Sequence, residues 1–142
     1  MKKIALTIIS VMLAASAAFA QDVIGKWKLD DGTAIVEVYK NGDAYNGKIV
    51  WLEEPTDADG TPAKDNNNPD PALRTRELIG LNMLSGLKKT AQNEYSGGKI
   101  YDPGNGKTYN CSMKVEGNVL KVRGSLDKRG LLGRTMNWFR VK

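Results

Sequence analysis

The side chains that could do chemistry in this sequence are carboxylates, guanidinium groups, amines and phenols, because the chain contains no histidine. Without histidine it lacks the usual base for a serine or cysteine nucleophile and the commonest ligand of zinc and haem. The single cysteine, Cys111, alternates with the apolar residues Tyr109, Met113 and Val115, which predicts a buried thiol. We therefore expect no cofactor and no histidine-dependent catalysis, and an intramolecular disulfide is excluded.

Most polar side chains that could hold a ligand lie in, or after, one long stretch without hydrophobic periodicity, residues 53–78. Long irregular connections in compact domains are usually functional. A carboxylate near an arginine can orient a polar ligand, and an aromatic ring can stack on an apolar or sugar-like one. The candidate ligand-binding residues are Trp51, Asp65, Asn68, Tyr101, Asp102, Tyr109 and Arg134.

Some of these acids have a plainer interpretation. Asp65 and Asn68 can simply stabilise turns, since aspartate and asparagine side chains bond nearby backbone groups. Asp57 and Asp59 resemble the start of a calcium loop, but the later acidic ligands of such a loop are missing. We therefore expect no metal site.

The elements that must position these residues are short segments of alternating apolar and polar residues. Turn signals such as Asp31-Gly32, Asn41-Gly42 and Gly117-Asn118 separate several of them. The eight segments are residues 24–30, 33–40, 44–53, 78–88, 94–101, 107–116, 119–126 and 134–141. They predict an all-β fold, a small eight-stranded antiparallel up-and-down barrel, because closure removes the exposed edges of such a sheet.

One segment, residues 78–88, is ambiguous. Leucine recurs at every third position, which suits a helix, whereas apolar residues at alternate positions suit a strand. Its two internal glycines would each cost a helix about 1 kcal/mol relative to alanine. We interpret the segment as a strand.

In an up-and-down barrel, successive connections alternate between the two ends. Eight strands therefore bring residues 53–78, 102–106 and 127–133 together at one open end, while tight turns close the other. A helix at residues 78–88 would place the first two loops at opposite ends. We expect the ligand site at the open mouth, with residues 65–69 folded over it as a lid and Trp27 as a plug at the closed end.

Residues 1–20 have the pattern of a cleavable signal peptide. Two lysines precede an apolar run that ends in Ala18-Phe19-Ala20, so cleavage is predicted after Ala20, and the periplasm is the simplest destination. Residues 21–142 then form a single domain with no transmembrane segment. Removing Lys2 and Lys3 lowers the formal net charge from +5 to +3, and the scattered lysines do not indicate nucleic-acid binding.

Two features resemble known families. Gly25-Lys26-Trp27 on the first segment and Arg140 on the last resemble the G-x-W signature of lipocalins and the arginine that covers its tryptophan. More specifically, the whole mature chain resembles the secreted bacterial family called domain of unknown function 2147. The motifs that carry this likeness are Gly25 to Trp27, Asp65 to Pro69, Gly98 to Tyr109 and Gly133 to Trp138.

The resemblance implies a periplasmic lipocalin-like (calycin) barrel and brings no established activity. The chain departs from typical lipocalins in its short first connection, Asp31-Gly32, and in lacking a clear C-terminal helix. A smaller and tighter barrel is therefore expected.

Three functions are compatible with the sequence. The first is non-catalytic binding of a small ligand, apolar or sugar-like, at the barrel mouth. The second is a protein–protein interaction module of the envelope that uses the long loop as its contact. The third, which we favour least, is a carboxylate-dependent enzyme that would need two acids, for instance Asp65 and Asp102, beside one pocket.

Overall fold

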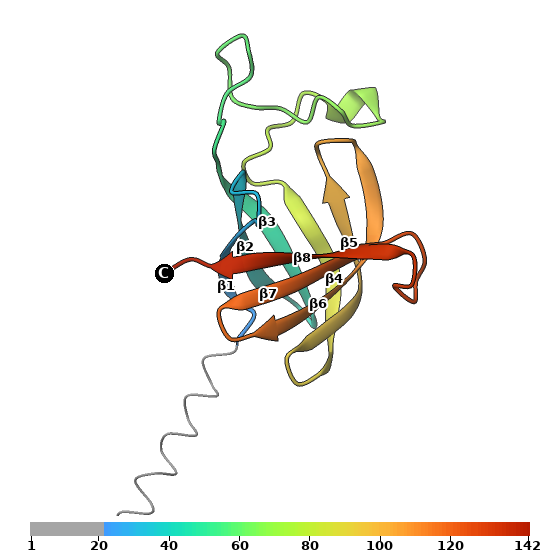
Figure 1. Ribbon diagram of the computed structural model, residues 1–142. Coiled ribbons are helices and arrows are strands. Elements are labelled where there is room, and N and C mark those ends of the chain that lie inside the picture. Colours follow the sequence, from blue (N-terminus) through green and yellow to red (C-terminus); the bar gives the residue numbers. More distant parts are fainter. Residues whose placement is uncertain (1–21) are drawn as a thin grey trace, which may run out of the picture.

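The computed structural model describes residues 22–142, so the predicted signal peptide lies outside the described residues. Its strands form one closed antiparallel barrel in chain order, in which β1 pairs with both β2 and β8 (Figure 1). The strands are β1 (Gly25–Lys28), β2 (Ala34–Asn41), β3 (Ala44–Leu52), β4 (Asn82–Ala91), β5 (Glu94–Asp102), β6 (Lys107–Glu116), β7 (Val119–Ser125) and β8 (Gly133–Arg140). This confirms the predicted eight-stranded up-and-down barrel.

The ambiguous segment is a strand for most of its length, since β4 begins at Asn82. The predicted strand started four positions too early, because residues 78–81 belong to the end of the long connection. That connection contains a single 3-10 turn, η2 (Pro71–Leu73). Among the described residues, no helix is long and apolar enough to cross a membrane.

The interior of the barrel is filled over much of its length. Trp27 and Trp138 are fully buried, together with aliphatic side chains such as Leu84, Leu87 and Leu120. Each large apolar side chain buried in this way stabilises the fold by about 1.5–3 kcal/mol. The barrel is therefore a packed core with limited free space, unlike a deep lipid-sized well.

Trp27 occupies the position expected of a plug. Its indole Nε1 donates a hydrogen bond to the Val23 carbonyl oxygen at 2.9 Å. The Arg140 guanidinium carbon lies 4.2 Å from the centre of a Trp27 ring, and Arg140 Nη2 donates to the Gly117 carbonyl in the β6–β7 turn. The residues of the G-x-W signature thus seal the end of the barrel that carries the short turns.

The four connections predicted to share the open end do so. The Glu53 amide donates to the Thr33 carbonyl, which joins the long connection to the β1–β2 turn. The Asn67 side-chain amide donates to the carbonyls of Pro103 and Gly104 in the β5–β6 turn, at 3.0 and 3.2 Å. Asn110 donates to the Leu126 carbonyl in the β7–β8 loop. Figure 1 shows the long connection rising from this end.

Candidate functional site

The open end contains a hollow of about 850 Å³ that enters the barrel between the strands, which we call the mouth pocket. Its apolar lining comes from side chains of β4, β5, β6, β8 and the residue after β1: Met83, Ile100, Tyr109, Met136 and Leu29. Its polar lining includes Asp30, Asp31, Asp102, Asn105, Ser125 and Arg134. An apolar floor with a few charged groups at the rim is typical of a small-molecule site.

Strand alternation explains why three of the predicted residues reach this pocket. Ile100 is buried and pairs with Tyr109 across β5 and β6, so both belong to the inner face at this level. Asp102 follows Ile100 by two residues and therefore has the same orientation. Arg134 precedes the inward residue Met136 by two positions on β8.

The charged groups of the mouth pocket differ in how far they are already engaged. Asp102 Oδ1 accepts the Gly104 amide at 2.8 Å, and Asp31 Oδ1 accepts the amide and hydroxyl of Thr33 at 3.0 and 2.7 Å. Arg134 is exposed, and the ion pairs within residues 22–142 do not include it. The rim therefore offers a guanidinium group and carboxylate oxygens to a polar head group.

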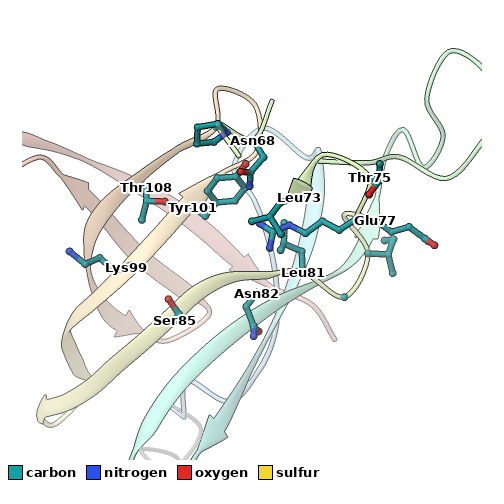
Figure 2. A pocket seen from close by; sticks show the side chains of 15 residues that line it. Asn68, Leu73, Thr75, Glu77, Leu81, Asn82, Ser85, Lys99, Tyr101 and Thr108 are labelled. Carbon is teal, nitrogen blue, oxygen red and sulfur yellow. The ribbon is translucent and has the colours of Figure 1, made fainter. Parts of the chain in front are cut away.

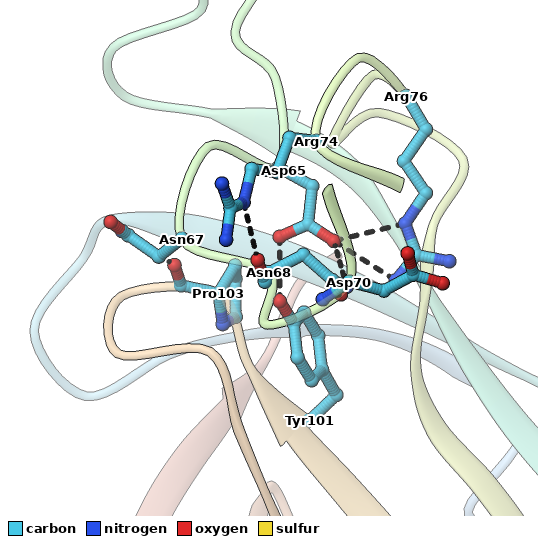
Figure 3. Close-up of polar contacts among 8 residues, drawn as sticks. All are labelled: Asp65, Asn67, Asn68, Asp70, Arg74, Arg76, Tyr101 and Pro103. Carbon is cyan, nitrogen blue, oxygen red and sulfur yellow. Dashed lines mark hydrogen bonds and ion pairs between the residues drawn. The ribbon is translucent and has the colours of Figure 1, made fainter. Parts of the chain in front are cut away.

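The other predicted polar residues form a separate cluster outside the barrel. The lid anchor, as we call it, consists of Asp65, Asn68 and Arg76 from the long connection and Tyr101 from β5 (Figure 3). Asp65 is fully buried; its Oδ1 accepts the Tyr101 hydroxyl at 2.7 Å, and its Oδ2 accepts the Asn68 amide at 2.8 Å. Arg76 Nε and Nη2 both lie 2.9 Å from the same Oδ2.

The electrostatics of the lid anchor follow from these bonds. Burial by itself would raise the pKa of Asp65, but the hydrogen bonds from Tyr101, Asn68 and Arg76 outweigh it and hold the pKa below its usual value. Burial and the bond to Asp65 raise the pKa of Tyr101. A carboxylate with all these donors is a structural group, and it has no room for a ligand.

The long connection, residues 53–81, is an ordered lid, but it does not cover the mouth pocket. None of its residues lines that pocket. It lies instead against the outer side of the β5–β6 turn, where a Cβ atom on Gly106 would collide with the Asn67 carbonyl oxygen. The prediction that residues 65–69 fold over the mouth is therefore wrong, because Tyr101 points outward and attaches the lid to the outer face.

A second hollow, of about 980 Å³, lies between this lid and the outer faces of β4 and β5 (Figure 2). Leu73, Thr75 and Glu77 of the lid and Ser85 and Lys99 of the strands line it, as Figure 2 shows. Asn68 and Tyr101 border it as well. It is the broader and more open of the two, so we take the mouth pocket, which combines an enclosed apolar floor with charged rim groups, as the candidate site.

Trp51 lies apart from both groups. In the pairing of β2 with β3, Ile35 faces Trp51 while Val36 faces Ile49, so Val50 is an extra residue that forms a bulge. The bulge turns Trp51 to the outer surface, where it is 40% exposed and lies beneath the Lys28 ammonium group at 5.0 Å. The expectation that Trp51 lines the mouth is not met, because simple alternation ignores the bulge.

Several lining residues were missed by sequence reasoning. Met83, Ile100 and Met136 occupy inward strand positions near the open end, and they could have been found by extending the alternation from Tyr109 and Arg134. Asp30 and Leu29 had no such signal, because they lie in an irregular turn. The carboxylates proposed as an enzyme pair, Asp65 and Asp102, are divided between the lid anchor and the mouth pocket and do not share a site.

Cys111 is buried on the inner face of β6, and burial raises the pKa of its thiol to about 12. The thiolate that a nucleophile or metal ligand needs is therefore disfavoured at neutral pH. In the part of the chain that the structure describes, no group of three or more cysteine, aspartate or glutamate side chains is placed to hold a metal ion.

Comparison with known proteins agrees with this architecture. A family model described as "Uncharacterized protein conserved in bacteria (DUF2147)" matches residues 25–140. The chain belongs to this family. The match runs from the glycine of the G-x-W signature to the arginine that covers its tryptophan, and it confirms the resemblance seen in the sequence. No curated protein sequence matches the chain at a significant level.

Among solved structures, this DUF2147 member is similar to a protein from the human pathogen Helicobacter pylori that is described as belonging to the lipocalin family. The two share 28% sequence identity with a TM-score of 0.76, and the match covers 85% of this chain and 84% of the other. The lipocalin-like barrel predicted from the sequence is thus confirmed by both the topology and the solved relative.

Proposed function

We propose that this DUF2147 protein is a secreted periplasmic binding protein that holds a small amphipathic molecule in the mouth pocket. The observation that carries the proposal is the division of that pocket into an apolar floor and a charged rim. The floor, which includes Ile100, Met83 and Met136, accepts an apolar group, and the rim, which includes Arg134 and Asp102, accepts a polar head.

The packed barrel limits what the ligand is. Trp27 and Trp138 fill the interior beyond the floor, so only a short apolar segment enters. A volume of about 850 Å³ lies within the range of pockets for small molecules and is open at its rim. The preferred ligand is therefore a short-chain or aromatic amphiphile.

The test is a thermal-shift series with three amphiphiles that share one tail and differ in their heads: octanoate, octylamine and octyl glucoside. A ligand that binds only the folded state raises the melting temperature. If Arg134 pairs with the head group, octanoate gives the largest shift, and Arg134→Gln removes most of it. If Asp102 and Asp30 dominate, octylamine gives the largest shift, and Asp102→Asn reduces it.

The matched control is Lys99→Gln, which removes an exposed cation from the outer face of β5 and leaves the mouth pocket intact. Extraction of protein purified from the periplasm, followed by mass spectrometry, searches for the natural ligand. Absence of any shift at millimolar amphiphile, together with absence of any copurified molecule, would contradict the proposal.

The proposed location rests on the signal-peptide pattern that ends at Ala20. Protein recovered from a periplasmic fraction is expected to begin at Gln21, and N-terminal sequencing checks this. An uncleaved chain that stays in the cytoplasm would exclude secretion.

One observation favours the alternative function of envelope protein binding. The part of the lid closed by the Thr56–Pro62 bridge projects beyond the barrel, away from the lid anchor (Figure 1). A pull-down from envelope extract with and without residues 57–61 separates the two functions. Specific partners lost with the deletion support this alternative, and unchanged partners refute it.

A further inference from the structure

The β7–β8 loop exposes more apolar surface than any other described segment of comparable length. Leu126, Leu131 and Leu132 are 74%, 73% and 66% exposed, whereas the next most exposed large apolar side chain of the described residues, Phe139, is 48% exposed. We call residues 126–132 the leucine loop. Soluble proteins rarely leave neighbouring leucines uncovered, so this loop is expected to meet an apolar partner.

The exposure is built into the loop by hydrogen bonds. The Asp127 carboxylate accepts the amides of Leu131 and Leu132 at 3.0 and 2.7 Å, and the Leu126 amide donates to the Leu132 carbonyl. At the base of the loop, Arg123 Nε donates to the Gly130 carbonyl at 2.6 Å. The backbone is thus held in one shape, and the leucine side chains have no place in the core.

The charges around the leucines are mainly positive. Lys128, Arg129 and Arg134 are all exposed at or beside the loop. Asp127, the acid within it, is occupied by the amides it accepts, and those bonds, with that of Leu132 the strongest, hold its pKa below the usual value. The other acids of the mouth belong to the β1–β2 turn and to β5.

We propose that the leucine loop docks the protein on the surface of an anionic phospholipid bilayer. Its leucines enter the boundary between head groups and acyl chains, and Lys128, Arg129 and Arg134 lie at the level of the lipid phosphates. Apolar side chains beside cations are the combination that interfacial membrane binding requires. A second copy fits less well, since a twofold contact through this loop would bring Lys128 and Arg129 of both copies together.

The location of the loop adds a functional consequence that rests on the proposed ligand site. Leu126 and Leu132 also line the mouth pocket. Docking through them sets the mouth pocket beside the bilayer, so an amphiphile can pass between lipid and protein along an apolar path. The docking itself needs no ligand, so the two proposals are tested separately.

The first test is co-sedimentation of the ligand-free protein with vesicles. We expect binding to vesicles of phosphatidylglycerol and phosphatidylethanolamine, weak binding to phosphatidylcholine vesicles, and a decrease as salt is raised. Leu131→Ser with Leu132→Ser is expected to lower partitioning roughly tenfold. Lys128→Gln with Arg129→Gln is expected to remove the preference for anionic lipid. Phe139→Ser, an exposed apolar residue on another part of the barrel, is the control and leaves binding unchanged.

The second test reports the inserted site directly. Cys111 is buried and its thiol pKa is raised to about 12, so a polarity-sensitive fluorophore reacts selectively with a Leu131→Cys variant. Its emission is expected to shift to shorter wavelength with anionic vesicles. No binding of the wild-type protein to anionic vesicles overturns the proposal, and so does equal binding of the double-serine variant. A dimer that the double-serine variant abolishes, without vesicle binding, assigns the loop to self-association instead. Unchanged melting temperatures show that the variants are folded.

Discussion

The lid anchor and the mouth pocket are two polar sites, about equally rich in charged groups, that lie at the same end of one barrel. In the lid anchor, each oxygen of Asp65 accepts hydrogen bonds from the protein itself, and the carboxylate is fully buried. In the mouth pocket, Arg134 and Asp30 are exposed beside an apolar floor. A polar cluster that is satisfied within the protein stabilises the fold, whereas one with unengaged groups next to free volume is available to a ligand.

The largest expected effect comes from neutralising one carboxylate in each site. Asp65→Asn places an amide among three donors and leaves Arg76 without its ion pair, so we expect the free energy of unfolding to fall by about 3 kcal/mol. Asp102→Asn, the matched control, keeps an acceptor for the Gly104 amide and is expected to change stability by less than about 0.5 kcal/mol. Urea denaturation of both variants checks the difference, and equal losses would show that the two sites are not distinct in kind.

A smaller effect is expected from the two tyrosines. Tyr101→Phe removes a hydrogen bond to a buried carboxylate and is expected to cost about 2 kcal/mol. The Tyr109 hydroxyl accepts the exposed Asn105 amide at 3.0 Å, so Tyr109→Phe is expected to cost about 0.5 kcal/mol. Thermal melts of the pair measure this contrast, and limited proteolysis shows whether Tyr101→Phe also releases the lid. A stable Tyr101→Phe variant would mean that the lid is held elsewhere.

The pH dependence of stability sharpens the comparison further. The folded pKa of Asp65 lies below its unfolded value of about 3.9, so its contribution is present above that value and is lost as the pH falls through the folded pKa. Wild-type stability is therefore expected to decrease below about pH 4, and Asp65→Asn is expected to show a shallower decrease. Denaturation midpoints between neutral and acidic pH measure it. Identical slopes for the two proteins would contradict the lowered pKa.

The smallest effect on stability is expected at the mouth. Arg134→Gln removes an exposed cation that makes no ion pair within the described residues, so the free energy of unfolding should change by less than about 0.5 kcal/mol. The same variant is expected to lose most of the thermal shift given by octanoate. A large loss of stability without ligand would place Arg134 among the structural residues instead.

Most of the barrel could be predicted, because its signals are local. Asn41-Gly42 and Gly117-Asn118 mark turns, and alternation identifies inward residues such as Tyr109 and Val122 within single strands. Counting strands then gave the shared end of the long connection and the β5–β6 turn, which the Asn67 contacts confirm.

The site was only partly predictable, because long-range details decide it. Trp51 faces outward since Val50 forms a bulge against β2, and a bulge depends on how two strands pair. Asp65 and Asp102 are the same residue type, and each is followed by turn-forming residues. Only the first meets a tyrosine hydroxyl from a strand 36 residues away, and that contact decides that it is structural.

The sequence by itself thus determined the eight strands, the closure of the barrel and the end at which the unusual loops gather, since periodicity and turn chemistry act over a few residues. Tertiary structure decided which acids are enclosed, which aromatic rings face the pocket, and that the lid docks outside the mouth. These properties depend on strand register and on contacts between distant segments, and a one-residue change in register reverses the face that every later side chain occupies.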